Sequence, residues 1–479
     1  MTLGPEGRVL EDGQQIIKTR DDPTPVWLER ADTEEEPDKP FTLPDGVTCS
    51  WAKAGENFGP EKLRSRIEPW LTALVQSEHL SLLIGSGLTH AVHFLATENS
   101  LPGMGKVKFS IFQDQIEVAA ERTAKAAQRN EPNFEDQLRV VNELLSGLKH
   151  YCPENVTFHG SKKLKREIKI LEQDISNAVE NLAKSILEGE RNLARACDNQ
   201  RENAFNYLVS FLMSFASRSG TRDRLHLFTT NYDRYIEVGA DVAGLRLIDR
   251  FVGAVTPVFR ASRLDVDLHY NPPGIRGEPR YLEGVARFTK LHGSVDWVDC
   301  HRAIRRFGLP FGAEDTRPYL AAPGLDSAGT MQLMIYPNPA KDRETIFYPY
   351  SELFRDFAAA VCRPNSTLVC YGYGFGDEHI NRVIEDMLTI PSAHLVIISY
   401  SDPLDRIMQT YERLGRNAQI TVLLGNHLGD LRTLVGHYLP KPAIDRTTFR
   451  MAELLKKRLG AESEQGQTAD TTDNEGTSS

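Results

Sequence analysis

The chain has 479 residues, of which 40% are hydrophobic and 25% are charged, a composition typical of globular proteins. Its 56 basic and 66 acidic residues give a net charge of -10, which argues against binding of nucleic acids or anionic membranes by the surface as a whole. Six cysteines without a CxxC pair, no secretory signal and no run of about 18 apolar residues argue against a zinc ribbon and a transmembrane helix, so we expect a cytoplasmic protein without direct membrane binding.

The N-terminal third of the chain begins without a regular pattern and then becomes periodic. Residues 1–57 are rich in proline, glycine and acidic residues, and they predict an extended N-terminal arm without a core of its own. From Pro60 to His79, apolar residues recur at the spacing of an amphipathic helix. The continuous apolar run LSLLIGSGLTH (Leu80–His90) follows, and it suits a strand that is buried on both faces of a parallel sheet.

The composition changes at residue 108. Glu, Lys, Ala, Leu, Gln and Arg dominate residues 108–220, whose periodicity predicts an all-helical insertion of about two to four helices. Strand and turn signals return at residue 225 and continue to about residue 440, where apolar segments such as STLVCYGYGFGD and AHLVIISYSD alternate with helical stretches. Alternation of this kind predicts βαβ units and a parallel sheet.

These elements combine into one predicted architecture. We expect an α/β fold with a Rossmann-like, mostly parallel sheet and helices on both faces. Residues 58–107 and 221–440 form the split sheet domain, and the helical insertion (108–220) interrupts it. Residues 441–479 are expected to form a C-terminal helix and a disordered polar tail.

Glycines and polar residues follow four of the predicted strands at the point where each strand ends. In an open parallel sheet, ligands bind beyond the carboxyl ends of the strands, so we expect these segments to meet in one cleft. Glycines let backbone N–H groups approach a phosphate, and amide, carboxyl and hydroxyl groups can bind ribose, so the set suits a dinucleotide. The segments are Gly85-Ser86-Gly87, Thr229-Thr230-Asn231-Tyr232-Asp233, Lys290-Leu291-His292-Gly293-Ser294 and Gly372-Tyr373-Gly374-Phe375-Gly376-Asp377.

Each of these segments also has a purely structural interpretation when it is taken alone. The glycine turn at 85–87 lacks the third glycine of the usual dinucleotide fingerprint, and the glycines at 372–376 can serve close packing of a strand on a helix. Asp233 and Asp377 precede predicted helices, which aspartate commonly caps, and a single histidine such as His292 is commonly structural. The occurrence of all four segments at successive strand ends favours a binding site.

The ordered set IGSG, TTNYD, KLHGS and GYGFGDEHIN resembles the sirtuin-like NAD-binding domains of bacterial defence proteins, over about residues 59–100 and 221–430. The resemblance implies that NAD+ is the substrate and that Asn231 and His292 are the catalytic pair. It also implies a set of NAD contacts, to which we add the end of another predicted strand at Ser399. The NAD-binding residues expected on this basis are Gly85, Ser86, Gly87, Thr230, Asp233, Gly372, Tyr373, Gly374, Asp377 and Ser399.

The chain departs from the sirtuin deacylases at two points. The deacylases carry a four-cysteine zinc module after the HG motif, whereas residues 293–371 contain only Cys300, Cys362 and Cys370, without paired spacing. The Asp-Phe-Arg segment that follows the glycine turn in the deacylases has no good match in this chain, which reads HAVHFLATENSLPGM. We therefore expect no zinc, and we expect hydrolysis of NAD+ rather than protein deacylation.

The two candidate catalytic residues suit this reaction. Cleavage of the nicotinamide–ribose bond passes through a transition state with oxocarbenium character, and nicotinamide leaves as a neutral base without a general acid. The uncharged amide of Asn231 can hold a water or a ribose hydroxyl at the anomeric carbon. His292 can accept the proton, because histidine ordinarily titrates near pH ~6.5, and Asp233 can bind the carboxamide or stabilise positive charge.

Two other functions remain open at this point. One is an NAD-dependent protein deacylase, which needs an acyl-lysine channel, and the other is a non-catalytic module that senses a nucleotide. Proteins similar to this chain deplete NAD in anti-phage defence, which implies an effector of abortive infection. They work as homo-oligomers, often with a second protein such as a HerA-type ATPase, so the resemblance implies a homo-oligomer with a trigger in trans. The helical insertion (108–220) is our candidate for the part of the chain that assembles the oligomer and controls the activity.

Overall fold

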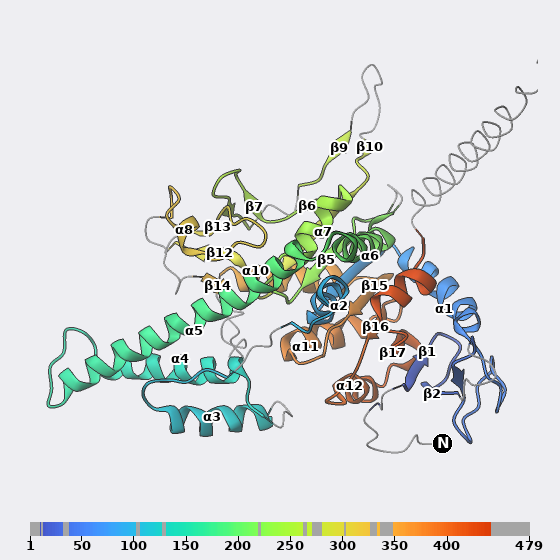
Figure 1. Cartoon of the computed structure of the whole chain (residues 1–479), viewed down its shortest axis with the longest axis horizontal. Helices are drawn as coiled ribbons and strands as arrows, with labels where there is room; N and C mark the ends of the chain where they lie inside the picture. The colour runs from blue at the N-terminus through green and yellow to red at the C-terminus, as the bar shows by residue number, and fades with distance from the viewer. Residues whose placement is uncertain are drawn as a thin grey trace, which may run out of the picture. The chain divides into compact units, whose positions relative to one another are not determined.

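Figure 1 shows the computed structural model of the chain, which describes residues 10, 13–31, 38–101, 106–126, 131–218, 222–261, 266–270, 280–300, 303–325, 333–335 and 348–441. The chain divides into two units, Met1–Leu439 and Pro440–Ser479. The sheets, helices and cavities considered below belong to the first unit. The predicted C-terminal helix and tail lie outside the described residues from residue 442 onward.

A ten-stranded sheet forms the centre of the first unit, with the strand order β3-β2-β1-β17-β16-β15-β4-β5-β11-β6. Every neighbouring pair from β17 to β6 is parallel, which confirms the prediction of a mostly parallel α/β sheet. The parallel strands are β4 (His79–Ile84), β5 (His226–Thr229), β6 (Arg246–Ile248), β11 (Val285–Lys290), β15 (Ser366–Tyr371), β16 (His394–Ser399) and β17 (Ile420–Gly425).

Helices cover both faces of this sheet, because successive strand residues point to opposite sides. In β4, Leu82 contributes to the hydrophobic core on one face and Leu83 to the core on the other. The first core includes α1 (Pro60–Val75), α2 (Ser86–Thr97), α6 (Asp198–Ala216) and α7 (Tyr235–Ala243). The second includes α10 (Tyr350–Val361), α11 (Glu378–Leu388) and α12 (Arg406–Leu414).

The N-terminal residues are more ordered than the predicted arm. They form β1 (Gln15–Lys18), β2 (Val26–Arg30) and β3 (Phe41–Thr42), which extend the sheet antiparallel from β17. Ile16 and Ile17 are fully buried in the cores on opposite faces of the sheet. These strands were not predicted because they are short and lie between proline-rich and acidic stretches, so their burial depends on the partner strand β17.

Among the described residues, four helices follow one another between α2 and β5, within the predicted two to four: α3 (Gln113–Ala126), α4 (Phe134–Tyr151), α5 (Ser161–Arg195) and α6. Most of the buried residues of α3, α4 and α5 belong to a separate hydrophobic cluster, whereas α6 packs into the core of the main sheet through Leu208 and Phe215. We use "helical segment" for α3–α5, at the left of Figure 1.

The remaining elements surround these layers. A second sheet has the order β14-β12-β13-β8-β7, and β9 pairs with β10. The bounds are β7 (Phe251–Val252), β8 (Val258–Phe259), β9 (His269–Tyr270), β10 (Arg280–Tyr281), β12 (Gly293–Asp299), β13 (Ile304–Arg306), α8 (Arg317–Leu320), β14 (Leu333–Ile335), η3 (Asn417–Gln419), α13 (Leu431–Thr433) and η4 (Leu434–Tyr438).

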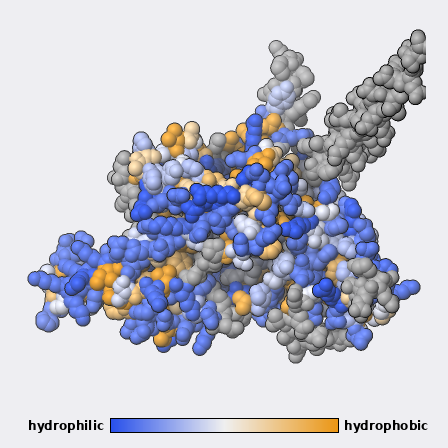
Figure 2. Space-filling view, viewed as in Figure 1, coloured by the Kyte–Doolittle hydropathy of each residue, from blue (hydrophilic) through white to orange (hydrophobic). Residues whose placement is uncertain are grey.

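The space-filling view shows a largely hydrophilic face with hydrophobic patches over the helical segment (Figure 2). Within the described residues, no helix combines the length and the apolar character that crossing a membrane requires.

Candidate functional site

A cavity of about 410 Å³ lies at the carboxyl ends of β4, β5, β11 and β15. The turns that follow these four strands all contribute to its lining, as expected for a ligand site in an open parallel sheet. Both predicted catalytic residues are in this lining. The predicted site residues that line the cavity are Asn231, His292, Gly85, Ser86, Thr230, Asp233, Tyr373, Gly374 and Asp377.

Three predicted contact residues do not line the cavity. Gly87 and Gly372 pack backbone to backbone, and the N–H of Gly87 donates to the carbonyl oxygen of Gly372 at 3.0 Å. Gly372 has a φ of 59°, and a Cβ on it would lie 2.6 Å from the Cα of Gly87, so a larger residue does not fit. The hydroxyl of Ser399 donates to the carbonyl oxygen of Ser401 at 3.0 Å. The two glycines therefore bring strand ends together rather than lining the cavity.

The side-chain amide of Asn231 is held in one orientation. Its Nδ2 donates to the carbonyl oxygen of Gly85 and to the hydroxyl oxygen of Thr89, both at 2.9 Å. The residue is only 8% exposed, and its backbone N–H donates to the hydroxyl oxygen of Thr229 at 3.0 Å. Because both amide protons are engaged, Oδ1 is the atom that remains to accept a hydrogen bond from a ligand or a water.

Thr89 links Asn231 to Asp233. The hydroxyl of Thr89 donates to Oδ2 of Asp233 at 2.8 Å, and Oδ1 of Asp233 accepts from the backbone N–H of Tyr235 at 3.1 Å, at the start of α7. Asp233 thus stabilises the start of a helix and also lines the cavity. Helix capping and ligand binding, the two roles considered for this residue, are therefore compatible. Thr89 itself was not among the predicted site residues, because nothing in the sequence separates it from other polar residues of a helix, although it is only 7% exposed.

His292 follows β11 directly and is 6% exposed. Its Nε2 lies 3.8 Å from Oδ2 of Asp377, which is the residue before α11. The rings of Tyr232 and Phe354 lie with their centroids 6.4 Å and 6.5 Å from that of the imidazole. A predicted NAD-binding residue, Asp377, therefore lies beside a predicted catalytic residue, beyond hydrogen-bond distance but within the range of an ion pair with a protonated imidazole.

Lys290 supports the turn that carries Asn231 and Asp233. Its Nζ is 2.9 Å from Oε1 of Glu237 and donates a short hydrogen bond to the carbonyl oxygen of Asp233. The lysine is 2% exposed. Burial raises the pKa of Glu237 to about 7, and the nearby charge of Lys290 acts against this rise. The lysine of the KLHGS motif is thus a structural support beneath the cavity.

Besides Thr89, several other lining residues were not predicted, and two groups of them matter most. Arg406, at the start of α12, adds a guanidinium group to the lining. Its position at the start of a helix that follows a parallel strand is the sequence signal that could have assigned it to the site. The second group is a wall formed by α5 of the helical segment, which no pattern in the sequence assigned to the site. The α5 residues of this wall are Leu182, Ser185, Ile186 and Gly189.

A buried ion pair joins α5 to the turn after β5. The side chains of Glu190 and Arg234 are 0% and 8% exposed, and Oε1 of Glu190 accepts from Nε of Arg234 at 3.1 Å. The same oxygen accepts from the backbone N–H of Arg234 at 3.0 Å, and Arg234 also donates to the carbonyl oxygen of Pro310 at 2.9 Å. The orientation of α5 is therefore coupled to the residue that follows Asp233.

Neither metal-binding geometry nor known relatives identify the site. In the described part of the chain, no group of three or more His, Cys, Asp or Glu residues is arranged to hold a metal ion. No protein-family model matches the chain, and a search of curated proteins finds no match.

Proposed function

We propose that the chain is an NAD+ hydrolase, which cleaves the bond between nicotinamide and ribose and releases nicotinamide and ADP-ribose. The observation that carries this proposal is that Asn231 and His292, from two different strand ends, line one cavity of about 410 Å³. This volume lies within the range of ~300–1,000 Å³ that is usual for small-molecule sites. The resemblance of four sequence motifs to sirtuin-like domains supports the same assignment.

The sheet topology supports a dinucleotide as the ligand. Without the edge strand β6, the parallel strands follow the order 3-2-1-4-5-6 when they are numbered along the chain, which is the order of Rossmann folds that bind dinucleotides. The order reverses between β4 and β15, and Ser86 and Gly374 follow these two strands in the cavity lining. In such folds the ligand binds at this reversal, where the N-terminus of α2 favours a phosphate. Arg406 adds a positive charge to the same cavity.

In the proposed reaction a water attacks the anomeric carbon, and the C–N bond to nicotinamide breaks as its electron pair moves to the pyridine nitrogen. Oδ1 of Asn231 accepts a hydrogen bond from the water or from a ribose hydroxyl and so positions it. His292 takes the proton of the attacking water, and the carboxylate of Asp377, 3.8 Å from its Nε2, favours the imidazolium that forms.

The proposed biological role is that of an effector of abortive infection against phages. Several large hydrophobic side chains of the helical segment are exposed, among them Val118 (50%), Tyr151 (70%) and Val156 (47%), and they support assembly of a homo-oligomer or binding of a partner. Some of the hydrophobic side chains visible in Figure 2 lie over this segment. A HerA-type ATPase is the partner that the sequence resemblance favours.

The test is an assay of purified protein with NAD+, in which nicotinamide and ADP-ribose are separated by chromatography and quantified, alone and with co-purifying proteins. We expect Asn231→Ala and His292→Ala to lower the rate by at least about 100-fold while the circular dichroism spectrum stays unchanged. Asn181→Ala and His150→Ala, at exposed positions of the helical segment, are the matched controls. Parent-rate hydrolysis by Asn231→Ala would contradict the assignment, and acetyl-ADP-ribose formed from an acetylated peptide would indicate a deacylase instead.

A further inference from the structure

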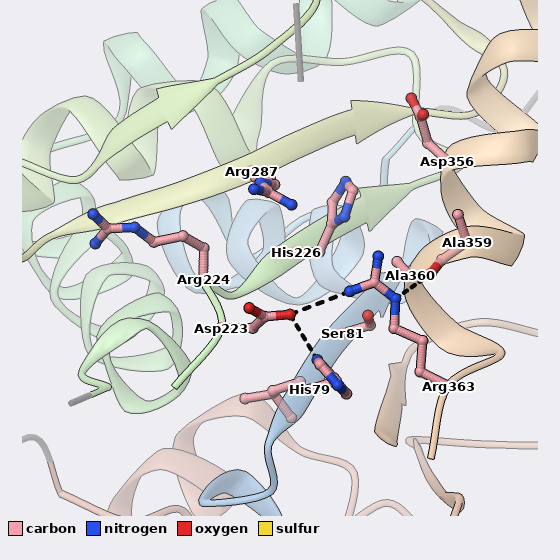
Figure 3. A pocket seen from close by; sticks show the side chains of 11 residues that line it. His79, Ser81, Asp223, Arg224, His226, Arg287, Asp356, Ala359, Ala360 and Arg363 are labelled. Carbon is pink, nitrogen blue, oxygen red and sulfur yellow. Dashed lines mark hydrogen bonds and ion pairs between the residues drawn. The ribbon is translucent and has the colours of Figure 1, made fainter. Parts of the chain in front are cut away.

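A second cavity, of about 130 Å³, lies at the other end of the central strands of the main sheet, beyond their amino ends (Figure 3). It is bounded by the amino ends of β4, β5 and β11 and by α10. The same three strands carry Gly85, Asn231 and His292 at their carboxyl ends, so the two cavities are separated by the length of the strands. The polar residues of its lining are His79, Ser81, Asp223, Arg224, His226, Arg287, Asp356 and Arg363.

The side chain of Arg287 is unpaired at this cavity. It makes neither an ion pair nor a hydrogen bond within the described parts of the chain, and its Nε is buried without a partner. The other charged side chains of the lining are paired, and His79 also contacts Asp223 at 2.6 Å. The pairs are Asp223 with Arg363 (3.2 Å), Asp356 with Arg250 (2.6 Å), which also lies 4.0 Å from Glu352, and Asp267 with Arg224 (3.1 Å). Among the described residues, Arg287 is therefore the arginine of this lining that makes no ion pair of its own.

Hydrogen-bond donors also lack acceptors at this place. Ser81 is 3% exposed and lines the cavity, and among the described residues its hydroxyl has no hydrogen-bond partner. His226 is 7% exposed, and its Nε2 lies 3.0 Å from the hydroxyl oxygen of Thr289. Burial lowers the pKa of His226 well below its usual value, and the charges of Arg287 and Arg363 lower it further, so the imidazole is neutral.

We propose that this cavity binds a small oxyanion of the phosphate class, with Arg287, Arg363 and Ser81 as its donors. An oxyanion supplies the counterion that Arg287 lacks and the acceptor that the Ser81 hydroxyl lacks. The volume of about 130 Å³ is sufficient for a small tetrahedral oxyanion. The carboxylates of Asp223 and Asp356 lie in the same lining, and each is already neutralised by an arginine.

The experiment measures thermal unfolding of the full chain in sodium phosphate and in sodium chloride of equal ionic strength. A ligand that binds only the folded state raises the Tm, so the parent protein should be stabilised by phosphate beyond the effect of chloride. Arg287→Gln should abolish this difference and Ser81→Ala should reduce it. Arg416→Gln, which alters an exposed arginine between α12 and η3, should leave it unchanged.

Inorganic phosphate can also enter the large cavity, and the variants separate the two sites because none of them lines that cavity. A phosphate effect that Arg287→Gln retains in full, or a parent protein without any effect beyond chloride, overturns the proposal. Should Arg287→Gln fail to fold, Ser81→Ala decides, because it removes a single hydroxyl. AMP in place of phosphate distinguishes the source: stabilisation by AMP that Arg287→Gln abolishes supports a phosphate ester, and its absence supports the free ion.

Discussion

The side-chain amide of Asn231 donates a hydrogen bond of 2.9 Å to the carbonyl oxygen of Gly85, so the end of β5 is tied to the glycine turn after β4. The second proton of the same amide goes to Thr89, which donates its own proton to Asp233. One threonine hydroxyl thus completes the orientation of the candidate catalytic amide. Thr89 is a positioning residue, because it acts through Asn231.

Thr89→Val replaces this hydroxyl with a methyl group of similar size and leaves one amide proton of Asn231 without an acceptor. We expect kcat for NAD+ hydrolysis to fall about ten-fold, since a buried hydrogen bond contributes about 1–1.5 kcal/mol, with a smaller change in KM. Thr89→Ser should restore most of the rate. Thr72→Val, on the exposed side of α1, is the control, and an unchanged kcat in Thr89→Val would show that Asn231 is oriented without it.

Two glycines two positions apart should respond differently to the same substitution. Gly372→Ala places a Cβ 2.6 Å from the Cα of Gly87 at a φ of 59°, and we expect it to lower the free energy of unfolding by about 2–4 kcal/mol. A Cβ on Gly374 meets nothing within 4 Å, so Gly374→Ala should keep the stability and weaken NAD+ binding. Urea unfolding and NAD+ titration measure the two effects, and equal stability losses in both variants would contradict this assignment.

These glycines also mark how far the sequence could predict the site. The parallel strands could be predicted because each is an apolar run that ends in glycine or a polar residue, and the strand ends placed Asn231 and His292 in one cleft. The difference between Gly372 and Gly374 could not be predicted, because both stand in the same GYGFG motif. It depends on the direction of each Cα–H bond relative to Gly87, which is a tertiary relationship.

The contribution of the helical segment could not be predicted for a similar reason. The periodicity of α5 (Ser161–Arg195) indicates an amphipathic helix, but its apolar face serves one hydrophobic cluster along most of its length and the large cavity near its C-terminal end. Which turn of a 35-residue helix reaches the cavity depends on where that helix crosses the sheet. The N-terminal strands are a further case, since β1 is stabilised only when it pairs with β17.

The stability of the protein should depend on pH through Glu237. Its pKa is raised to about 7 by burial, so between pH ~4.3, where an unfolded glutamate titrates, and pH 7 the folded state holds a proton that the unfolded state has lost. The stabilisation from this group is full below the unfolded pKa and is lost as the pH rises through 7. Glu237→Gln removes the dependence, so the stability of the parent relative to this variant should fall between pH 5 and pH 8. The same comparison with Glu188→Gln, at an exposed position, should show no such trend.

The ion pair between Glu190 and Arg234 should be the most sensitive link between the helical segment and the site. Glu190→Gln leaves a buried guanidinium without its counterion, and we expect a loss of about 3–5 kcal/mol in the free energy of unfolding. The double variant Glu190→Leu/Arg234→Met removes both charges and should be less destabilised than the sum of its single variants, because neither charge is then left unpaired. Urea unfolding of the four proteins of the double-mutant cycle gives the coupling energy. Additive losses would mean that the two side chains act independently, and α5 would then be joined to the turn after β5 by packing alone.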